Sequence, residues 1–225
     1  MFRVTTLFAG LALSASAFAL SLADLTQQDA TGGLKDALTQ GAQIAVKQLG
    51  TPGGFSNNEA VRIELPGNLG KVARTMKMMG MGAEIEQLET SMNLAAEAAV
   101  PQAQALLVSA VKKMTVQDAK SILSGPQDSA TQYLNKSSRE QIRAKFLPIV
   151  KRATDQVGLA QQYNSFAGQA ATFGALDAKS ANIESYVTEQ ALDGLFEIIA
   201  QQEAKIRQNP AGAATSLAKK VFGAL

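Results

Sequence analysis

The stretch of sequence that decides the fold runs from residue 183 to residue 208 and reads IESYVTEQALDGLFEIIAQQEAKIRQ. Its apolar residues recur at the three- and four-residue spacing of a helix, and the set comprises Ile183, Tyr186, Val187, Ala191, Leu192, Leu195, Phe196, Ile198, Ile199 and Ala200. A stripe this wide predicts a central helix that packs on more than one side. Asn182 is a suitable N-cap, and Asn209–Pro210 is expected to end the helix.

Glycines, prolines and capping residues predict further helices on the N-terminal side of this segment, and a short one follows it. The expected helices cover residues 34–49, 69–79, 83–99, 101–114, 115–124, 137–157 and 219–222. Thr115 with Asp118, and Ser137 with Glu140, have the spacing of capping boxes that start two of them. Pro148 is expected to bend the helix over 137–157.

One segment departs from the helical pattern. Residues 61–66 read VRIELP, which alternates apolar and charged side chains, and Gly53-Gly54-Phe55 precedes them. The segment near residues 55–66 is either a short strand or an extended loop, and the absence of an identifiable partner strand favours the loop. The predicted fold class is therefore all-α, a single-domain multi-helix bundle over residues 34–223.

The first residues resemble an export signal. A short basic start is followed by the apolar run LFAGLAL at residues 7–13, and Ala17-Phe18-Ala19 fits the small-x-small rule for signal peptidase. We expect residues 1–19 to be a signal peptide cleaved after Ala19, although a retained short anchor is the alternative. Residues 20–33, ending in Gly32-Gly33, are then expected to be a flexible N-terminal segment.

This leader predicts export to the periplasm. Charges interrupt every later apolar stretch, so we do not expect an integral membrane protein after cleavage. The chain has no Cys, which argues against a lipoprotein.

The composition excludes several function classes. Among its 225 residues the chain has no Cys and no His, so thiolate or imidazole catalysis and the usual zinc or haem ligands are excluded. No cofactor or metal site is predicted. The net charge of +2 lacks the basic excess of a nucleic-acid-binding protein.

Five residues are candidate buried polar or functional positions. Glu97 is flanked by alanines, so we expect it to be buried and paired, for example with an arginine; a proton-transfer role is the alternative. Asp193, between Leu192 and Gly194, has the same two interpretations. Arg207 either compensates the helix dipole or pairs with Asp193. The other two candidates are Asp118 and Tyr133.

A candidate apolar binding surface comprises Phe55, Met76, Met78, Met79 and Met81. Methionine side chains adapt to varied ligands, and Gly80 and Gly82 lie beside them. The four methionines also suit the filling of a helix–helix corner, which is the interpretation we favour for them.

Charge is unevenly distributed along the chain. Residues 136–152 are mainly basic, whereas residues 177–203 are mainly acidic. We expect two complementary helix faces that pack together. The alternative is a basic surface that meets anionic lipid headgroups, lipopolysaccharide or peptidoglycan.

Several short segments together resemble one bacterial family, domain of unknown function 4197. The matching segments are GGF at 53–55, IELP at 63–66, NLAAEAA at 93–99, DAKSILSG at 118–125, ATQY at 130–133, YVTEQALDGLF at 186–196 and IRQNP at 206–210. They occur in matching order over about residues 34–223. The resemblance implies an exported helical protein and implies no particular biochemical activity.

The leading hypothesis is a non-enzymatic interaction or structural module of the cell envelope, because packing signals abound and catalytic motifs do not. Its partner would be an envelope protein or a lipid-like ligand. An apolar-ligand-binding protein that uses the Met-rich corner is the alternative. An enzyme that uses carboxylates or a Ser/Lys pair is a second alternative, although no S-x-x-K motif is present.

Overall fold

The computed structural model describes residues 25–67, 78, 80, 82–157, 161, 163, 164 and 182–225. The helices are α1 (Gln27–Leu49), α3 (Ala83–Ala99), α4 (Ala103–Lys113), α5 (Val116–Leu123), α6 (Ser129–Val157), α8 (Ile183–Gln208) and α9 (Ser216–Phe222), with 3-10 turns η2 (Val100–Gln102) and η3 (Pro210–Gly212). The described residues contain no strand, so the all-α prediction is confirmed. The expected signal peptide and the helix over 69–79 fall outside the described residues.

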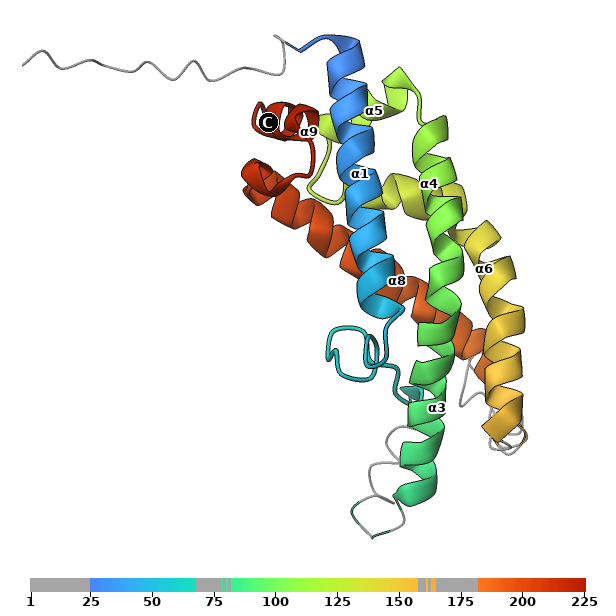
Figure 1. Ribbon diagram of the computed structural model, residues 1–225. Coiled ribbons are helices and arrows are strands. Elements are labelled where there is room, and N and C mark those ends of the chain that lie inside the picture. Colours follow the sequence, from blue (N-terminus) through green and yellow to red (C-terminus); the bar gives the residue numbers. More distant parts are fainter. Residues whose placement is uncertain are drawn as a thin grey trace, which may run out of the picture.

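Helix α8 lies at the centre of the bundle. It packs against α1, α3 and α6, and Figure 1 shows it crossing behind the column formed by α3 and α4. Helices α3 and α4 follow one another almost end to end, with Pro101 in the η2 turn between them. The prediction of a central helix packed on more than one side is therefore confirmed.

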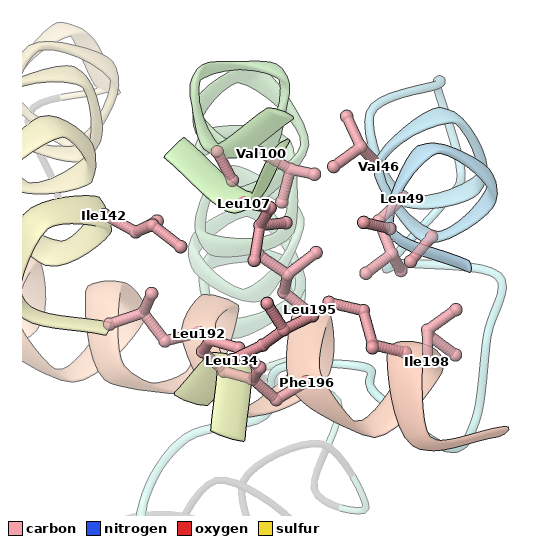
Figure 2. Packing of buried hydrophobic residues seen from close by; sticks show 14 of the residues in the cluster. Val46, Leu49, Val100, Leu107, Leu134, Ile142, Leu192, Leu195, Phe196 and Ile198 are labelled. Atoms are coloured by element: carbon pink, nitrogen blue, oxygen red, sulfur yellow. The ribbon is translucent and has the colours of Figure 1, made fainter. Parts of the chain in front are cut away.

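The core consists mainly of aliphatic side chains from these helices. In Figure 2, Leu192 and Leu195 of α8 point toward Leu107 of α4 and Ile142 of α6, and all four side chains are fully buried. Burial of each such side chain stabilises the fold by about 1.5–3 kcal/mol. Many buried alanines lie between the larger residues, which lets the helix axes approach one another closely.

Local capping signals predicted two helix starts correctly. Asn182 accepts a hydrogen bond from the Ser185 amide at 2.9 Å, and α8 begins at the next residue. The capping box at the start of α5 is complete, because Thr115 N–H donates to Asp118 at 2.8 Å and Asp118 N–H donates to Thr115 Oγ1 at 3.1 Å.

The predicted start of the helix over 137–157 is wrong, since α6 begins at Ser129. The hydroxyls of Ser137 and Ser138 donate to the carbonyls of Tyr133 and Leu134, four residues earlier, at 2.8 and 2.6 Å. Serine satisfies its hydroxyl in this way inside a helix, so the Ser–Glu spacing here does not mark a cap.

The first helix also begins earlier than predicted. Thr26 caps α1 by accepting from the Asp29 amide at 3.0 Å, so residues 27–33 are helical rather than part of a flexible segment. Gly33 does not break the helix but allows α9 to approach it closely. A Cβ atom at Gly33 would lie only 2.5 Å from Cγ2 of Val221 and 2.7 Å from the carbonyl oxygen of Leu217.

Gly33→Ala is expected to lower the free energy of unfolding by about 1–3 kcal/mol, because the new methyl group would push α9 away from α1. Gly41→Ala in the same helix is the matched control. There the nearest atom, Cβ of Gln202, lies at 3.4 Å, so the higher helix propensity of alanine should add up to about 1 kcal/mol. Urea unfolding of both variants measures the two effects; a Gly33→Ala protein as stable as the parent would contradict the close approach.

One continuous helical stretch, Ile85–Lys113, is long and apolar enough to cross a membrane by length and composition. Half of its apolar window is buried inside the protein, where it packs against neighbouring helices. The core helix of a soluble bundle meets the same criterion, so length and composition alone do not identify a membrane span.

Candidate functional site

Residues 51–67 form a loop, here called the docked loop, that lies against α3 and α8 below the end of α1 (Figure 1). Short-range turns shape its first half: the Gly54 amide donates to Thr51 O at 2.9 Å and the Asn57 amide donates to Gly53 O at 3.0 Å. Gly53 has a φ of 84°, a left-handed conformation that favours glycine. Residues 62–66 are extended without forming a strand, so the loop interpretation of the sequence is confirmed.

The buried carboxylate of Glu97 holds the first half of the docked loop. Its Oε1 atom accepts from the amides of Phe55 and Ser56 at 3.1 and 3.2 Å and from the Ser56 hydroxyl at 3.2 Å. Glu97 is buried as expected, but its partner is the main chain of a loop and not an arginine. The physical reason is that the turn directs two adjacent N–H groups toward α3, where only a side-chain acceptor can satisfy them.

Two further side chains hold the second half of the docked loop. The Asn93 amide accepts from Ile63 N–H and donates to Ile63 O, both at 2.9 Å, in the manner of a neighbouring strand. The Tyr186 hydroxyl donates to Glu64 O at 2.8 Å. The loop backbone is thus fixed from α3 on one side and from α8 on the other.

Apolar side chains of the docked loop complete its attachment. Phe55 and Ile63 are fully buried, and Phe55 packs where α8 has Gly194. A Cβ atom at Gly194 would lie 2.8 Å from Cε1 of Phe55 and 3.1 Å from Cβ of Val61. Assignment of Phe55 to an apolar binding surface is therefore wrong, because the absence of a side chain at Gly194 opens a core position for its ring.

Exposed charged side chains of the docked loop line an open hollow of about 800 Å³. Glu59, Arg62 and Glu64 form its loop side, and Tyr186 and Gln190 form its α8 side. A second hollow, of about 560 Å³, is lined by residues 51–54 and 57–60 of the loop together with Gln48 at the end of α1. The loop thus presents polar groups on a firmly held backbone.

Tyr186, which holds the docked loop, makes the stability of the protein depend on pH in the alkaline range. Burial, with a smaller effect from the carboxylates of Glu64 and Glu89, raises the pKa of Tyr186 to about 12. Unfolded tyrosine ionises near pH 10, so the folded chain binds the phenolic proton more tightly. The corresponding stability is present below about pH 10 and is lost as the pH rises toward 12.

We expect the free energy of unfolding to fall by about 1–2 kcal/mol over this range, less than the whole pKa shift implies because Tyr186 is only half-buried. Tyr186→Phe should remove that part of the decrease, as measured by urea unfolding at a series of pH values. Burial also raises the pKa of Tyr133, so Tyr133→Phe is the comparison variant that measures the separate share of this second tyrosine in the decrease. An unchanged pH profile in Tyr186→Phe would contradict this assignment.

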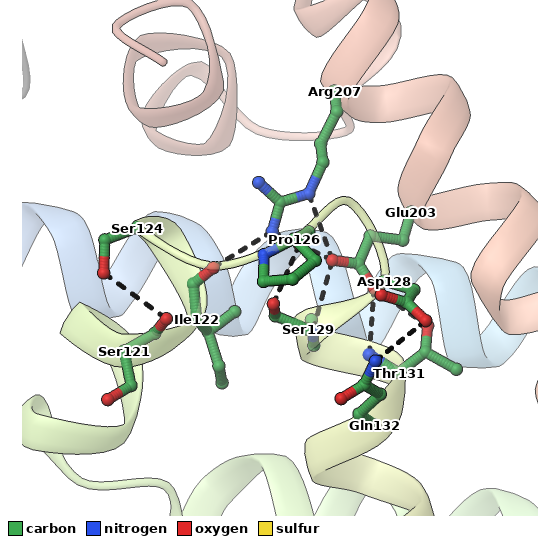
Figure 3. Close-up of polar contacts among 11 residues, drawn as sticks. Ser121, Ile122, Ser124, Pro126, Asp128, Ser129, Thr131, Gln132, Glu203 and Arg207 are labelled. Carbon is green, nitrogen blue, oxygen red and sulfur yellow. Dashed lines mark hydrogen bonds and ion pairs between the residues drawn. The ribbon is translucent and has the colours of Figure 1, made fainter.

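A second buried carboxylate, that of Glu203, joins α8 to the start of α6 (Figure 3). It accepts from the amides of Ala130 and Thr131 at 3.2 and 2.8 Å and from the Thr131 hydroxyl at 2.8 Å. These amides are in the first turn of α6, which lacks intrahelical acceptors and favours a negative charge. Glu203 was not among the candidate residues predicted from the sequence.

Arg207 pairs with Glu203 at 2.9 Å and not with Asp193. Its guanidinium also donates to Ile122 O at 3.2 Å, and it lies 5.7 Å from the ring centre of Phe222. Arg207 therefore links α8 to α5 and α9, and its side chain is only 10% exposed.

Asp193 is exposed rather than buried and forms an ion pair with Arg139 of α6 at 2.7 Å. Arg139 and Arg143 both bind Glu189, each also at 2.7 Å. Burial acts to raise the pKa of Glu189, but the hydrogen bonds from the two arginines outweigh it and hold the pKa below its ordinary value. The basic and acidic segments thus form the expected complementary faces of α6 and α8.

The remaining candidates from the sequence are Asp118, Tyr133 and the four methionines. Asp118 serves as the capping partner of Thr115, and hydrogen bonds from the Thr115 amide and hydroxyl lower its pKa. Tyr133 is partly buried on α6. Met78 is exposed, whereas Met76, Met79 and Met81 lie outside the described residues.

The buried carboxylates of Glu97 and Glu203 both accept hydrogen bonds from the backbone of neighbouring segments. Among the described residues, no group of three or more acidic side chains could hold a metal ion. Two buried side-chain atoms lack a hydrogen-bond partner in this part of the chain, namely Oε2 of Glu97 and Oγ1 of Thr188. The arrangement thus supports fixed presentation of a loop surface more directly than it supports proton transfer.

No curated protein and no solved structure matches the chain. A family model described as "Protein of unknown function (DUF4197)" matches residues 24–223, which agrees with the resemblance seen in the sequence. The chain therefore belongs to the DUF4197 family.

Proposed function

We propose that the protein is exported to the periplasm and acts there as a non-enzymatic interaction module, which binds another protein of the cell envelope through the surface of the docked loop. The observation that carries this proposal is the attachment of the loop. Glu97, Asn93 and Tyr186 fix its backbone from two helices, while Glu59, Arg62 and Glu64 remain exposed around a hollow of about 800 Å³. A preorganised surface loses little conformational entropy when a partner binds.

The polar groups of the loop favour a protein as the partner. Charged and amide side chains line the hollow, and acidic Glu59 and Glu64 flank basic Arg62 along the chain. Such alternation gives electrostatic selectivity toward a complementary protein surface. Two carboxylates had proton transfer as an alternative role in the sequence: Glu97 holds the loop, and Asp193 forms an ion pair with Arg139 between α8 and α6.

Site-specific photocrosslinking in living cells tests the interaction. A crosslinking amino acid at Arg62 should give one discrete adduct with an envelope protein. The same amino acid at exposed Lys136 of α6 is the matched control and should not give that adduct. No adduct at Arg62, or the same adducts at both positions, would argue against the docked loop as the binding surface.

Export is tested separately. Cell fractionation should place the protein in the periplasmic extract, with Leu20 as the first residue of the purified chain. A cytoplasmic protein that retains residues 1–19 would contradict this part of the proposal, whatever the crosslinking result.

A further inference from the structure

A small apolar cleft lies between the start of α1 and α5. Figure 1 shows that this end of α1 is opposite the end near the docked loop. Its volume is about 260 Å³, and its apolar walls are Leu25, Ala30, Val116, Ala119 and Leu123. Gln27, Thr31, Lys120 and Ser124 supply the polar part of its lining. Since α1 has 23 residues, the two ends of the helix are about 35 Å apart.

The cleft exposes apolar surface that the described residues do not cover. Ala119 and Leu123 are buried in the core, but Val116 is 39% exposed despite its branched apolar side chain. Leu25 and Ala30 are only partly buried. An apolar chain that filled the cleft would remove this surface from water, and each added methylene should strengthen binding about fourfold.

One lysine lines the cleft, and three more lie at the same end of the bundle. Lys120 lines the cleft, and Lys112 and Lys113 end α4 just before α5 begins. Lys35, one turn along α1 from Thr31, donates to Lys112 O at 3.0 Å, which brings its ammonium to the same end of the bundle. None of these four lysines forms an ion pair with another residue in the described part of the chain.

The neighbouring acids are already engaged. Asp29 pairs with Lys220 of α9 at 3.0 Å. Asp118 accepts two hydrogen bonds from the neutral Thr115 and keeps its negative charge, but the four lysines outnumber these two acids. The edge of the cleft therefore attracts an anion, while its interior favours an apolar chain.

We infer that this cleft binds a single-chain anionic amphiphile, with the acyl chain between Ala30 and Val116 and the anionic head at Lys120. The volume limits the occupant to one chain rather than the two chains of a membrane phospholipid. This site is separate from the docked loop, so the inference does not depend on the proposed interaction with a protein.

Calorimetric titration of the detergent-free protein with octanoate, decanoate and dodecanoate tests the inference. We expect one site, an affinity that rises about fourfold per methylene, and dodecylammonium binding at least several-fold more weakly than dodecanoate. Ala30→Phe should fill the cleft and abolish binding. Lys120→Glu, an exposed substitution, should weaken dodecanoate binding about fivefold.

Two exposed positions of α6 give the matched controls. Ala144→Phe and Lys136→Glu make the same chemical changes away from the cleft and should leave the affinity unchanged. Thermal unfolding followed by circular dichroism establishes that each variant is folded, and Lys120→Glu keeps the test decisive if Ala30→Phe does not fold. Unaltered binding in the folded cleft variants, or equal binding of dodecylammonium, would overturn the inference.

Two further measurements separate the alternatives. Anionic phosphatidylglycerol vesicles should not retain the protein; retention by vesicles without dodecanoate binding would mean that this end meets a bilayer and would overturn the single-chain site. Glu97→Ala should leave dodecanoate binding intact, because Glu97 holds the docked loop and not the cleft. Loss of photocrosslinking with dodecanoate binding intact would therefore count against the docked-loop proposal alone.

Discussion

Replacing Glu203 with alanine is expected to lower the free energy of unfolding by about 3–5 kcal/mol. The Glu203 side chain is only 2% exposed and lies 2.9 Å from the guanidinium of Arg207. Its removal would leave the nearly buried charge of Arg207 without a counter-ion and the amides of Ala130 and Thr131 without an acceptor. Urea unfolding followed by circular dichroism measures the loss.

Glu197→Ala is the matched control, because Glu197 is exposed on the same helix and, among the described residues, accepts a hydrogen bond from Gln201 alone. It should change the stability by no more than about 0.5 kcal/mol. The stability of Glu203→Gln should lie between those of Glu203→Ala and Glu197→Ala. Glutamine keeps an acceptor for the α6 amides but loses the charge that faces Arg207. A Glu203→Ala protein as stable as Glu197→Ala would contradict the structural role of this carboxylate.

A double-mutant cycle separates the ion pair from the helix contact. Arg207→Met alone leaves the Glu203 carboxylate with only amide and hydroxyl donors, whereas the double variant removes both charges. If the ion pair accounts for most of the stability, Arg207→Met lowers the free energy of unfolding much less in the Glu203→Ala protein than in the parent protein. If the contact with α6 dominates, the two losses add.

The parts of this fold that the sequence predicted correctly depend on local signals. Asn182 caps α8 and Thr115 caps α5, and each interacts with an amide three residues away, so a short stretch of sequence contains both partners. The buried face of α8 was also predictable, because the spacing of apolar residues indicates which side of a helix is buried, whichever helices pack against it. The helix starts predicted at Leu34 and Ser137 were wrong because the local signals there have other roles. Gly33 allows the close approach of α9, and the Ser137 hydroxyl donates to a carbonyl inside α6.

The candidate site was only partly predictable, since its contacts join distant residues. The flanking alanines indicated that Glu97 is buried, but its partners Phe55 and Ser56 lie about 40 positions earlier in a loop. Glu203 was missed although a signal existed. It follows Ile199 by four residues and precedes Ile206 by three, so it occupies the apolar stripe of α8. An acid in such a stripe, four residues before Arg207, indicates a buried pair.

Replacing Glu97 with alanine is expected to lower the free energy of unfolding by about 2–3 kcal/mol and to release the docked loop. The amides of Phe55 and Ser56 would lose the oxygen that satisfies both of them, at a place where Phe55 is fully buried. Hydrogen exchange should then accelerate at these two amides more than at those of α8. The exchange pattern distinguishes local release of the loop from general loss of stability.

Glu86→Ala, at an exposed position of the same helix α3, is the matched control and should leave both stability and exchange unchanged. Glu97→Gln should keep the loop largely in place, because a side-chain carbonyl can still accept from Phe55 and Ser56. Continued protection of the two amides in Glu97→Ala would contradict the anchoring role. If the docked loop is the binding surface, crosslinking through Arg62 should follow the same order: present in Glu86→Ala, reduced in Glu97→Gln and lost in Glu97→Ala. A fixed backbone is what the proposed interaction requires, so the two measurements should decline together.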